Sequence, residues 1–412
     1  MPSRSAPFTA TAFRYVPLRL AGQGLEFLGW LVMARGLGTE QLGRLSVAFL
    51  VSRYVGLIAD WGALGRGTRD VASQGRHGSV PKYLKLRTVL SVCLTPLVWL
   101  GLGVTSNGDM AAVSVVVLAI GLNRDWIALG MGRGGSAALP GFVQGGIVAV
   151  GSTLAMNASG GAWVLAAGYG VGLVLSVALN RGSAVRSTDA GAAGIMAENG
   201  QASPYAWLLV ASLAIQITSS FDTVIVAALL GPSAAGVYAA VYRFPNAIIA
   251  VAGGLASVFL PTATASFHGD PEGHRRLLRN ASIASTVGAG IVLLVTPVFV
   301  FCVPLLLGPA FAVGQAPLAI LMVSTVAILA AAPWHTLLVA AGRDRIYAMI
   351  VLTGAVANII LVRSLTPSFA LVGAASATLV VQIGLAVAVR EAAKHLRNLN
   401  DDEAEEAVDG PD

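Results

Sequence analysis

Long apolar runs alternate with short polar or glycine-rich breaks along almost the whole chain. A helix needs about 20 apolar residues to cross a bilayer, and most of these runs reach that length. The pattern therefore predicts an all-α integral membrane protein with about twelve transmembrane helices. We expect these helices at 15–34, 42–65, 88–105, 110–129, 138–157, 162–180, 204–229, 235–262, 281–307, 317–340, 346–364 and 370–390.

The composition supports a membrane protein and excludes several other classes. Apolar residues make up 56% of the 412 positions and charged residues only 11%, against about 25% charged residues in a soluble domain. This balance excludes a disordered chain, and the basic residues lie in short clusters that do not form a nucleic-acid-binding surface. Metal-ligand spacings and catalytic motifs are absent, and no loop is long enough for a catalytic domain. We predict no enzymatic activity, no metal and no resident cofactor.

The positive charges predict how the chain is oriented. Lys and Arg concentrate in every second break between the apolar runs, as the positive-inside rule requires of cytoplasmic loops. Both termini are then cytoplasmic and the number of helices is even. The abundance of Ala, Gly, Val and Arg over Lys favours a bacterial source, so we expect a multi-pass protein of the bacterial cytoplasmic (inner) membrane.

Breaks in composition divide the chain into five parts. We predict a cytoplasmic N-terminus at 1–14, an N-lobe of six helices at 15–180, and a cytoplasmic linker at 181–203. A C-lobe of six helices follows at 204–390, and an acidic cytoplasmic tail at 391–412. We expect the acidic end of this tail, at 401–406, to be solvated and disordered. Five tryptophans lie near predicted span ends, where membrane proteins carry aromatic belts: Trp30, Trp61, Trp99, Trp163 and Trp207.

A short motif occurs once in each predicted lobe. Leu37-Gly38-x4-Gly43 and Leu230-Gly231-x4-Gly236 share the pattern LG-x4-G, and each lies in the turn between the first two helices of its lobe. Two lobes of equal size, joined by a polar linker, are typical of transporters built from parallel repeats. We therefore expect two related six-helix lobes in the same orientation.

Six charged residues lie inside predicted spans and away from the span ends: Arg19, Glu26, Arg53, Asp60, Asp222 and Arg243. Each would cost about 2.5–3.5 kcal/mol at the bilayer centre, so we expect them to face a bundle interior or a watery cavity. Arg19 and Glu26 are seven residues apart, as are Arg53 and Asp60, which places each pair on one helix face. Two interpretations remain open: the charges pair with one another to fasten the helices, or they form a binding site.

The arginines indicate the chemistry of such a site. Arg53 and Arg243 lie in the second helix of each lobe. A guanidinium stays charged and binds phosphate oxygens through a fork of donors, so these residues, with Arg19, suit an anionic, phosphate-bearing cargo. Glu26, Asp60 and Asp222 would balance these charges or couple transport to H⁺ or Na⁺.

These residues lie in motifs that resemble the polysaccharide biosynthesis (oligosaccharide flippase) family of the multidrug/oligosaccharidyl-lipid/polysaccharide (MOP) exporter superfamily. The motifs are Leu37-Gly38-x4-Gly43, Asp60-Trp61-Gly62, Asp125-Trp126-x3-Gly130, Asp222, Leu230-Gly231-x4-Gly236-x-Tyr238, Arg243 and Pro261. The resemblance implies two six-helix lobes around a V-shaped central cavity that opens alternately to each side. It also implies a flippase that moves undecaprenyl-diphosphate-linked oligosaccharide units to the periplasmic leaflet for cell-surface polysaccharide biosynthesis.

The leading hypothesis is therefore a flippase for a lipid-linked oligosaccharide. Its expected partners are the undecaprenyl diphosphate sugar, membrane lipid, a polysaccharide polymerase and glycosyltransferases, with no nucleic acid. Two alternatives stay open. A multidrug/cation antiporter of the same fold would use acidic and aromatic cavity residues, and a non-transporting scaffold of a polysaccharide synthesis complex would not need the cavity arginines.

Overall fold

The structure is a computed structural model that describes residues 8–62, 67–68, 71, 80–106, 108–155, 157–180, 204–269 and 271–408. The predicted linker at 181–203 lies outside the described residues. Within them, every regular element is helical. The helices are α1 (Phe8–Asp60), α3 (Val80–Thr105), α4 (Val115–Leu122), α5 (Asp125–Gly130), α6 (Gly134–Ser152), α7 (Ala158–Leu179), α8 (Pro204–Leu230), α9 (Pro232–Gly269), α10 (Pro271–Leu307), α11 (Gln315–Ala340) and α12 (Asp344–Val408), with short 3₁₀ helices at Ala111–Ser114 and Pro309–Gly314.

The number of membrane spans agrees with the prediction. Nine helices in the described part of the chain are long and apolar enough to cross a membrane. Two of them, α1 and α12, each contain two spans, because the backbone is non-helical at Gly38 (φ 72°) and at Ala370 (φ 48°). The 19-residue α6 is not among these nine, but it packs against α1 and α7, and we count it as the remaining span. These make the twelve spans that the apolar runs predict.

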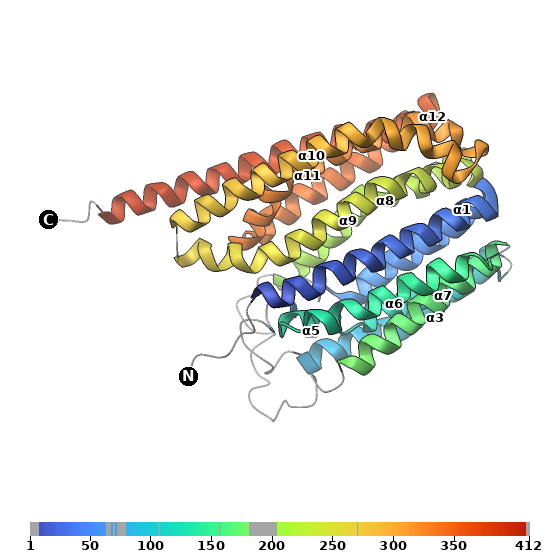
Figure 1. Cartoon of the computed structure of the whole chain (residues 1–412), viewed down its shortest axis with the longest axis horizontal. Coiled ribbons are helices and arrows are strands. Elements are labelled where there is room, and N and C mark those ends of the chain that lie inside the picture. Colours follow the sequence, from blue (N-terminus) through green and yellow to red (C-terminus); the bar gives the residue numbers. More distant parts are fainter. Residues whose placement is uncertain are drawn as a thin grey trace.

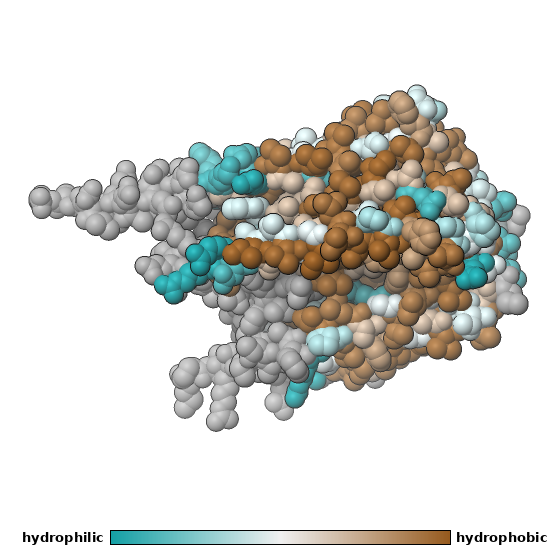
Figure 2. Space-filling view, turned by 45° about the horizontal axis from the view of Figure 1, so that its top comes forward, coloured by the Kyte–Doolittle hydropathy of each residue, from teal (hydrophilic) through white to brown (hydrophobic). Residues whose placement is uncertain are grey.

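The helices form two bundles that lie side by side along the long axis of the molecule. Figure 1 shows α1 and α3–α7 in the lower bundle and α8–α12 in the upper bundle, with both chain ends at the same end of the molecule. We call the end with the termini the inner end, and the opposite end the outer end. Figure 2 shows a broad apolar surface between polar ends, as a bilayer requires. The chain is therefore a multi-pass membrane protein.

Corresponding turns of the two lobes share their backbone geometry. Gly38 and Gly231 both have positive φ, 72° and 88°, where each second helix begins. Gly132 and Gly342, at the ends of α5 and α11, have φ of 72° and 71°. At both of these ends the backbone N–H of the residue after the glycine donates a hydrogen bond to the carbonyl oxygen five residues earlier. The pairs are Arg133 N to Ala128 O and Arg343 N to Leu338 O. This is the Schellman arrangement, in which glycine adopts the left-handed conformation at no steric cost.

The paired turns support the parallel repeat that the LG-x4-G motif predicts. The second pair, Gly132-Arg133 and Gly342-Arg343, was not recognised from the sequence, because a two-residue match is too short to detect without the backbone geometry.

The prediction of a disordered acidic tail is wrong for its described part. The last helix, α12, continues to Val408. The reason is local: from Arg390 onward the chain is rich in Ala, Glu, Lys, Arg and Leu, which are strong helix formers, and Lys394 pairs with Glu391 one turn away. At the other terminus, α1 begins at Phe8, inside the stretch predicted as a cytoplasmic N-terminus.

Candidate binding site between the lobes

The repeated motif brings the two lobes together at the outer end. A Cβ atom on Gly43 would overlap with the carbonyl oxygen of Pro232, and a Cβ atom on Gly236 would overlap with the carbonyl oxygen of Thr39. The first turn of the second span of α1 therefore touches the first turn of α9 through backbone atoms. Only glycine permits this approach at either position, and it closes the outer end between the lobes.

An aromatic layer lies on the inner side of this contact. The guanidinium carbon of Arg243, on α9, is 3.6 Å from the ring centroid of Trp30 and 5.6 Å from that of Phe49, both on α1. Phe244 meets Phe27 edge to face with a centroid distance of 5.4 Å. A narrow crevice between the lobes is lined by Trp30, Leu31, Ala34, Leu42, Ser46, Ala239, Ala240, Arg243 and Leu307.

Glu26 lies next to this layer and is held by two polar side chains of the N-lobe. The hydroxyl of Tyr169 donates a hydrogen bond of 3.0 Å to Glu26 Oε1, and the amide of Gln144 donates one of 3.2 Å to Oε2. The carboxylate interacts electrostatically with Arg243 without a direct hydrogen bond. Glu26 is therefore positioned by α6 and α7 and is directed toward the interface between the lobes.

Arg53 brings a second positive charge to the same place. It lies in the inner half of its span, and its side chain is exposed. Its charge acts on both Tyr169 and Arg243, so the guanidinium lies close enough to the interface between the lobes to influence these two buried groups. Of the described residues, none forms a hydrogen bond or an ion pair with the guanidinium of Arg53 or of Arg243. We call Arg53, Arg243, Glu26, Tyr169 and Gln144 the interlobe arginine site.

Tyr54 extends the contact between the lobes to the level of Arg53. Its hydroxyl lies 3.1 Å from Ser220 Oγ and 3.4 Å from the carbonyl oxygen of Gln216, both on α8. Its ring meets that of Phe221 at a centroid distance of 5.8 Å. The two lobes are thus in contact from the outer end to the level of the site.

Arg19 lies away from this site, although the sequence grouped it with Arg53 and Arg243. Its guanidinium lies against α6 at Gly141 and interacts electrostatically with Asp125. Arg19 is seven residues before Glu26 on the same helix, so it lies about 10 Å closer to the inner end. The structure therefore associates Arg19 with Asp125 within the N-lobe.

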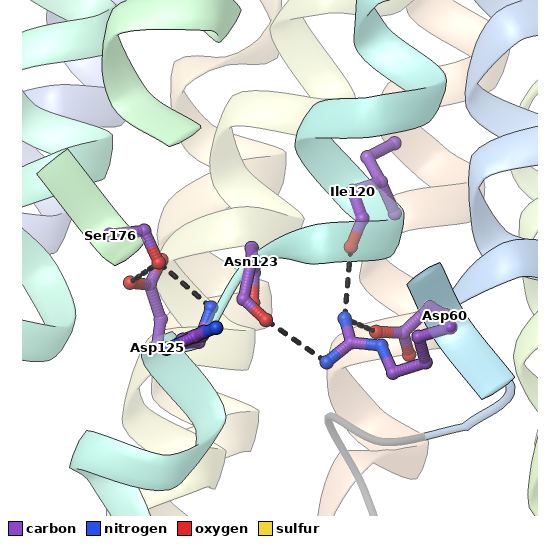
Figure 3. Close-up of polar contacts among 7 residues, drawn as sticks. Asp60, Ile120, Asn123, Asp125 and Ser176 are labelled. Carbon is purple, nitrogen blue, oxygen red and sulfur yellow. Dashed lines mark hydrogen bonds and ion pairs between the residues drawn. The ribbon is translucent and has the colours of Figure 1, made fainter. Parts of the chain in front are cut away.

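Asp60 also lies away from the site. It forms an ion pair with Arg87 and not with Arg53 or Arg243. Arg87 Nη2 is 2.6 Å from Asp60 Oδ1, and the Arg87 side chain is fully buried. The same guanidinium donates hydrogen bonds of 3.1 Å and 3.0 Å to the carbonyl oxygens of Ile120 and Asn123 (Figure 3). These carbonyl groups lie at the end of α4, where backbone acceptors lack helical partners. Arg87 thus ties α1 and α3 to the break between α4 and α5.

The motif Asp125-Trp126-x3-Gly130 lies beside this network. Ser176 donates a hydrogen bond of 2.7 Å to Asp125 and accepts one of 2.8 Å from the backbone N–H of Arg124 (Figure 3). The ring of Trp126 is buried, 5.7 Å from the guanidinium carbon of Arg87. The motifs that begin at Asp60 and Asp125 therefore hold the inner half of the N-lobe together.

Replacing Asp60 with alanine should destabilise the protein by about 3–5 kcal/mol, because the buried guanidinium of Arg87 would lose its ion pair with this carboxylate. The melting temperature of the purified protein in detergent measures this effect. Glu40→Ala is the matched control, since it breaks the exposed pair with Arg44, which is worth less than about 1 kcal/mol. Equal melting temperatures for the two variants would contradict the structural role of Asp60.

Asp222 is fully buried inside the C-lobe and accepts three hydrogen bonds. Tyr238 and Thr378 donate their hydroxyls to it at 2.7 Å and 3.1 Å, and the backbone N–H of Thr223 donates at 3.0 Å. These donors come from α8, α9 and α12. Its charge also acts on Tyr54 of the other lobe. Asp222 is therefore a carboxylate held by neutral donors behind the lobe interface.

Several residues of the site were not recognised from the sequence. Trp30 was assigned to an interfacial belt, but only 2% of it is exposed and it lies in the layer between the lobes. Trp30 lies four residues after Glu26, so the two side chains lie on one helix face. This spacing could have indicated that Trp30 belongs to the same site as Glu26. Tyr169 and Gln144 carried no such signal, because nothing in the local sequence of α6 or α7 indicates that they bind Glu26.

No known family model matches the chain, and no curated protein matches it in sequence. Solved structures do match it. An inward-facing conformation of a multidrug resistance MATE family transporter of the MOP superfamily has 14% identity and a TM-score of 0.67, over 91% of this chain and 96% of that chain. An outward-facing conformation of such a transporter has 15% identity and a TM-score of 0.67, over 94% and 96%.

A third similar structure is a MOP superfamily transporter from Pyrococcus furiosus, for which a reverse polarity of the binding pocket is reported to suggest a different function. It has 14% identity and a TM-score of 0.66, over 95% of this chain and 97% of that chain. These matches show that the chain has the fold of MATE transporters of the MOP superfamily. They confirm the predicted all-helical fold of about twelve spans.

Proposed function

We propose that this protein is an alternating-access transporter of an anionic, phosphate-bearing cargo. The observation that carries the proposal is the pair Arg53 and Arg243, which come from opposite lobes and interact with no carboxylate by hydrogen bond or ion pair among the described residues. The fold supports it, because its structural neighbours are transporters described in inward-facing and outward-facing conformations.

The charge of the site favours an anion. The guanidinium groups of Arg53 and Arg243 and the carboxylate of Glu26 give the site one net positive charge. Glu26 already accepts hydrogen bonds from Tyr169 and Gln144. Each guanidinium presents a planar fork of donors that matches two phosphate oxygens. A diphosphate could therefore bind both arginines at once and neutralise the site.

The specific cargo we propose is an undecaprenyl-diphosphate-linked oligosaccharide, moved across a bacterial cytoplasmic membrane with both protein termini in the cytoplasm. The family motifs around Gly38, Asp60 and Arg243 support this choice. The sugar and diphosphate would cross between the lobes while the prenyl chain stays in the lipid. The polymerase and glycosyltransferases that use such a cargo are the proposed partners.

A multidrug/cation antiporter is the second candidate, and two observations favour it. The similar structures include multidrug resistance MATE transporters. Glu26 accepts a hydrogen bond from Tyr169, whose ring meets that of Phe49, and a carboxylate beside aromatic rings would suit an organic cation. The Pyrococcus furiosus structure indicates that pocket polarity differs within this fold. We give Arg53 and Arg243 more weight, because their positive charges would repel a cation.

Ligand binding to the purified protein tests the choice. Undecaprenyl diphosphate should raise the melting temperature in detergent, because a ligand stabilises the state that binds it. Tetraphenylphosphonium, an organic cation, should leave the melting temperature unchanged. The opposite result would favour the antiporter, and no shift with either ligand would favour a scaffold that does not transport.

Asp222 is the residue that we propose for coupling transport to H⁺ or Na⁺. Asp222→Asn keeps the size of the side chain and removes its charge, so transport in proteoliposomes should lose most of its response to an imposed pH or Na⁺ gradient. Asp109→Asn, at an exposed outer turn, is the matched control and should keep the response. Unchanged gradient dependence in Asp222→Asn would exclude this role.

A further inference from the structure

Arg243 belongs to the C-lobe, but its guanidinium rests on aromatic rings of the N-lobe. The guanidinium carbon is 3.6 Å from the centroid of the Trp30 ring, well within the range of a cation–π interaction, and 5.6 Å from that of Phe49. We call these three residues the interlobe clasp. It joins α9 to both spans of α1, between the outer glycine contact and Arg53.

The aromatic side of the clasp is built into the N-lobe. The rings of Trp30 and Phe49 meet edge to face at 5.3 Å, and those of Phe49 and Tyr169 at 5.7 Å. Tyr169 in turn donates its hydroxyl to Glu26. Trp30 and Phe49 are both almost fully buried. The rings therefore form a rigid receptor for one cation, with a carboxylate at its far side.

The clasp leaves polar groups without hydrogen bonds. The indole N–H of Trp30 is buried and has no acceptor among the described residues. The guanidinium of Arg243 likewise forms no hydrogen bond with them. A ligand with phosphate oxygens would supply acceptors that the rings cannot, so it would compete with the rings for Arg243.

On the basis of the proposed function, we propose that Trp30 is a positioning residue that holds Arg243 while the outer end is closed. A diphosphate at the interlobe arginine site draws Arg243 off the Trp30 ring. The release removes one attachment between the lobes and favours opening of the outer end. Trp30 thereby links the binding of cargo to the conformational change.

Labelling of a cysteine at position 46 tests the clasp. Ser46 is buried and lines the crevice beside Trp30 and Arg243, so a reagent outside the membrane reaches it only when the lobes separate. The experiment uses the full chain with Cys93→Ser, Cys302→Ser and Ser46→Cys in right-side-out vesicles, with a membrane-impermeant maleimide. Loss of the clasp should raise the labelling rate.

In Trp30→Leu the cysteine at position 46 should be labelled about tenfold faster than in the parent. This factor corresponds to a decrease of about 1.4 kcal/mol in the free energy of opening the outer end. Trp30→Phe keeps a ring face and should be labelled at an intermediate rate. Trp163→Leu removes an exposed tryptophan of α7 and should match the parent. A parental rate in Trp30→Leu would overturn the proposal. So would equal rates in Trp30→Phe and Trp30→Leu, because the ring would then not be the cause.

Inorganic pyrophosphate tests the competition for Arg243. Supplied on the inner side, it should raise the labelling rate of the parent toward that of Trp30→Leu and have little effect on Trp30→Leu itself. An equal increase in both proteins would show that pyrophosphate acts elsewhere and would overturn the competition.

Failure of the clasp can be distinguished from failure of the proposed function, because labelling requires no transport. Parental labelling of Trp30→Leu, together with loss of transport when Arg53 is replaced, would reject the clasp and keep the transporter. Fast labelling of Trp30→Leu with normal transport by variants of Arg53 and Arg243 would keep the positioning role and reject the anionic cargo.

Discussion

Replacing Arg53 or Arg243 with alanine should lower transport of a diphosphate-bearing cargo by about 10- to 100-fold, with no loss of protein from the membrane. Hydrogen bonds to charged groups contribute about 1.5–3 kcal/mol each, and a factor of ten corresponds to about 1.4 kcal/mol. Neither side chain holds the fold through a hydrogen bond or an ion pair in the described structure, so the variants should remain abundant. Transport is measured as cell-surface polysaccharide and as lipid-linked oligosaccharide exposed on the outer leaflet.

A conservative variant and a matched control test whether the effect comes from the guanidinium groups of the site. Arg243→Lys keeps the charge but loses the planar fork and should transport at an intermediate rate. Arg44→Ala removes an arginine of the same helix as Arg53 that pairs with Glu40 at the surface, and it should behave as the wild type. Normal transport by both Arg53→Ala and Arg243→Ala would exclude these residues from the cargo site.

Replacing Gly236 with alanine should prevent the outer end from closing and reduce transport more than tenfold. The new Cβ atom would overlap with the backbone carbonyl of Thr39, which cannot rotate away as a side chain can. Overpacking of this kind costs about 1–3 kcal/mol, and here it acts only while the lobes are in contact. The cysteine at position 46 should therefore be labelled rapidly from outside.

Gly24→Ala is the control for this effect, because a Cβ atom at Gly24 meets nothing within 4 Å and alanine favours the helix. It should close and transport as the wild type does. If Gly236→Ala were labelled as slowly as Gly24→Ala, the backbone contact would not be what closes the outer end.

The fold could be predicted from the sequence because each span has its own signal. A bilayer requires a separate apolar run for every crossing, so the runs can be counted without knowledge of tertiary contacts. The insertion cost of charges likewise identified Arg53, Arg243 and Glu26 as residues that avoid lipid. The structure brings these three together at the interface between the lobes.

The partners of these charges could not be predicted, because they depend on which helices pack together. Arg87 was placed in an inner loop, since its span was expected to start at residue 88, but α3 begins at Val80 and carries Arg87 into the bundle opposite Asp60. Arg19 shares a helix face with Glu26, and its position beside Asp125 follows from the packing of α1 on α6. Spacing along one helix does not identify its neighbours.

The glycine contact at the outer end also has an evolutionary consequence. If the two lobes arose by duplication of an ancestral half, the two copies of one turn now press against each other, Gly43 on Pro232 and Gly236 on Thr39. Neither copy can then accept a larger residue by itself, however far the remaining sequence of the halves diverges. Descendants of such a duplication should keep both glycines or lose them together.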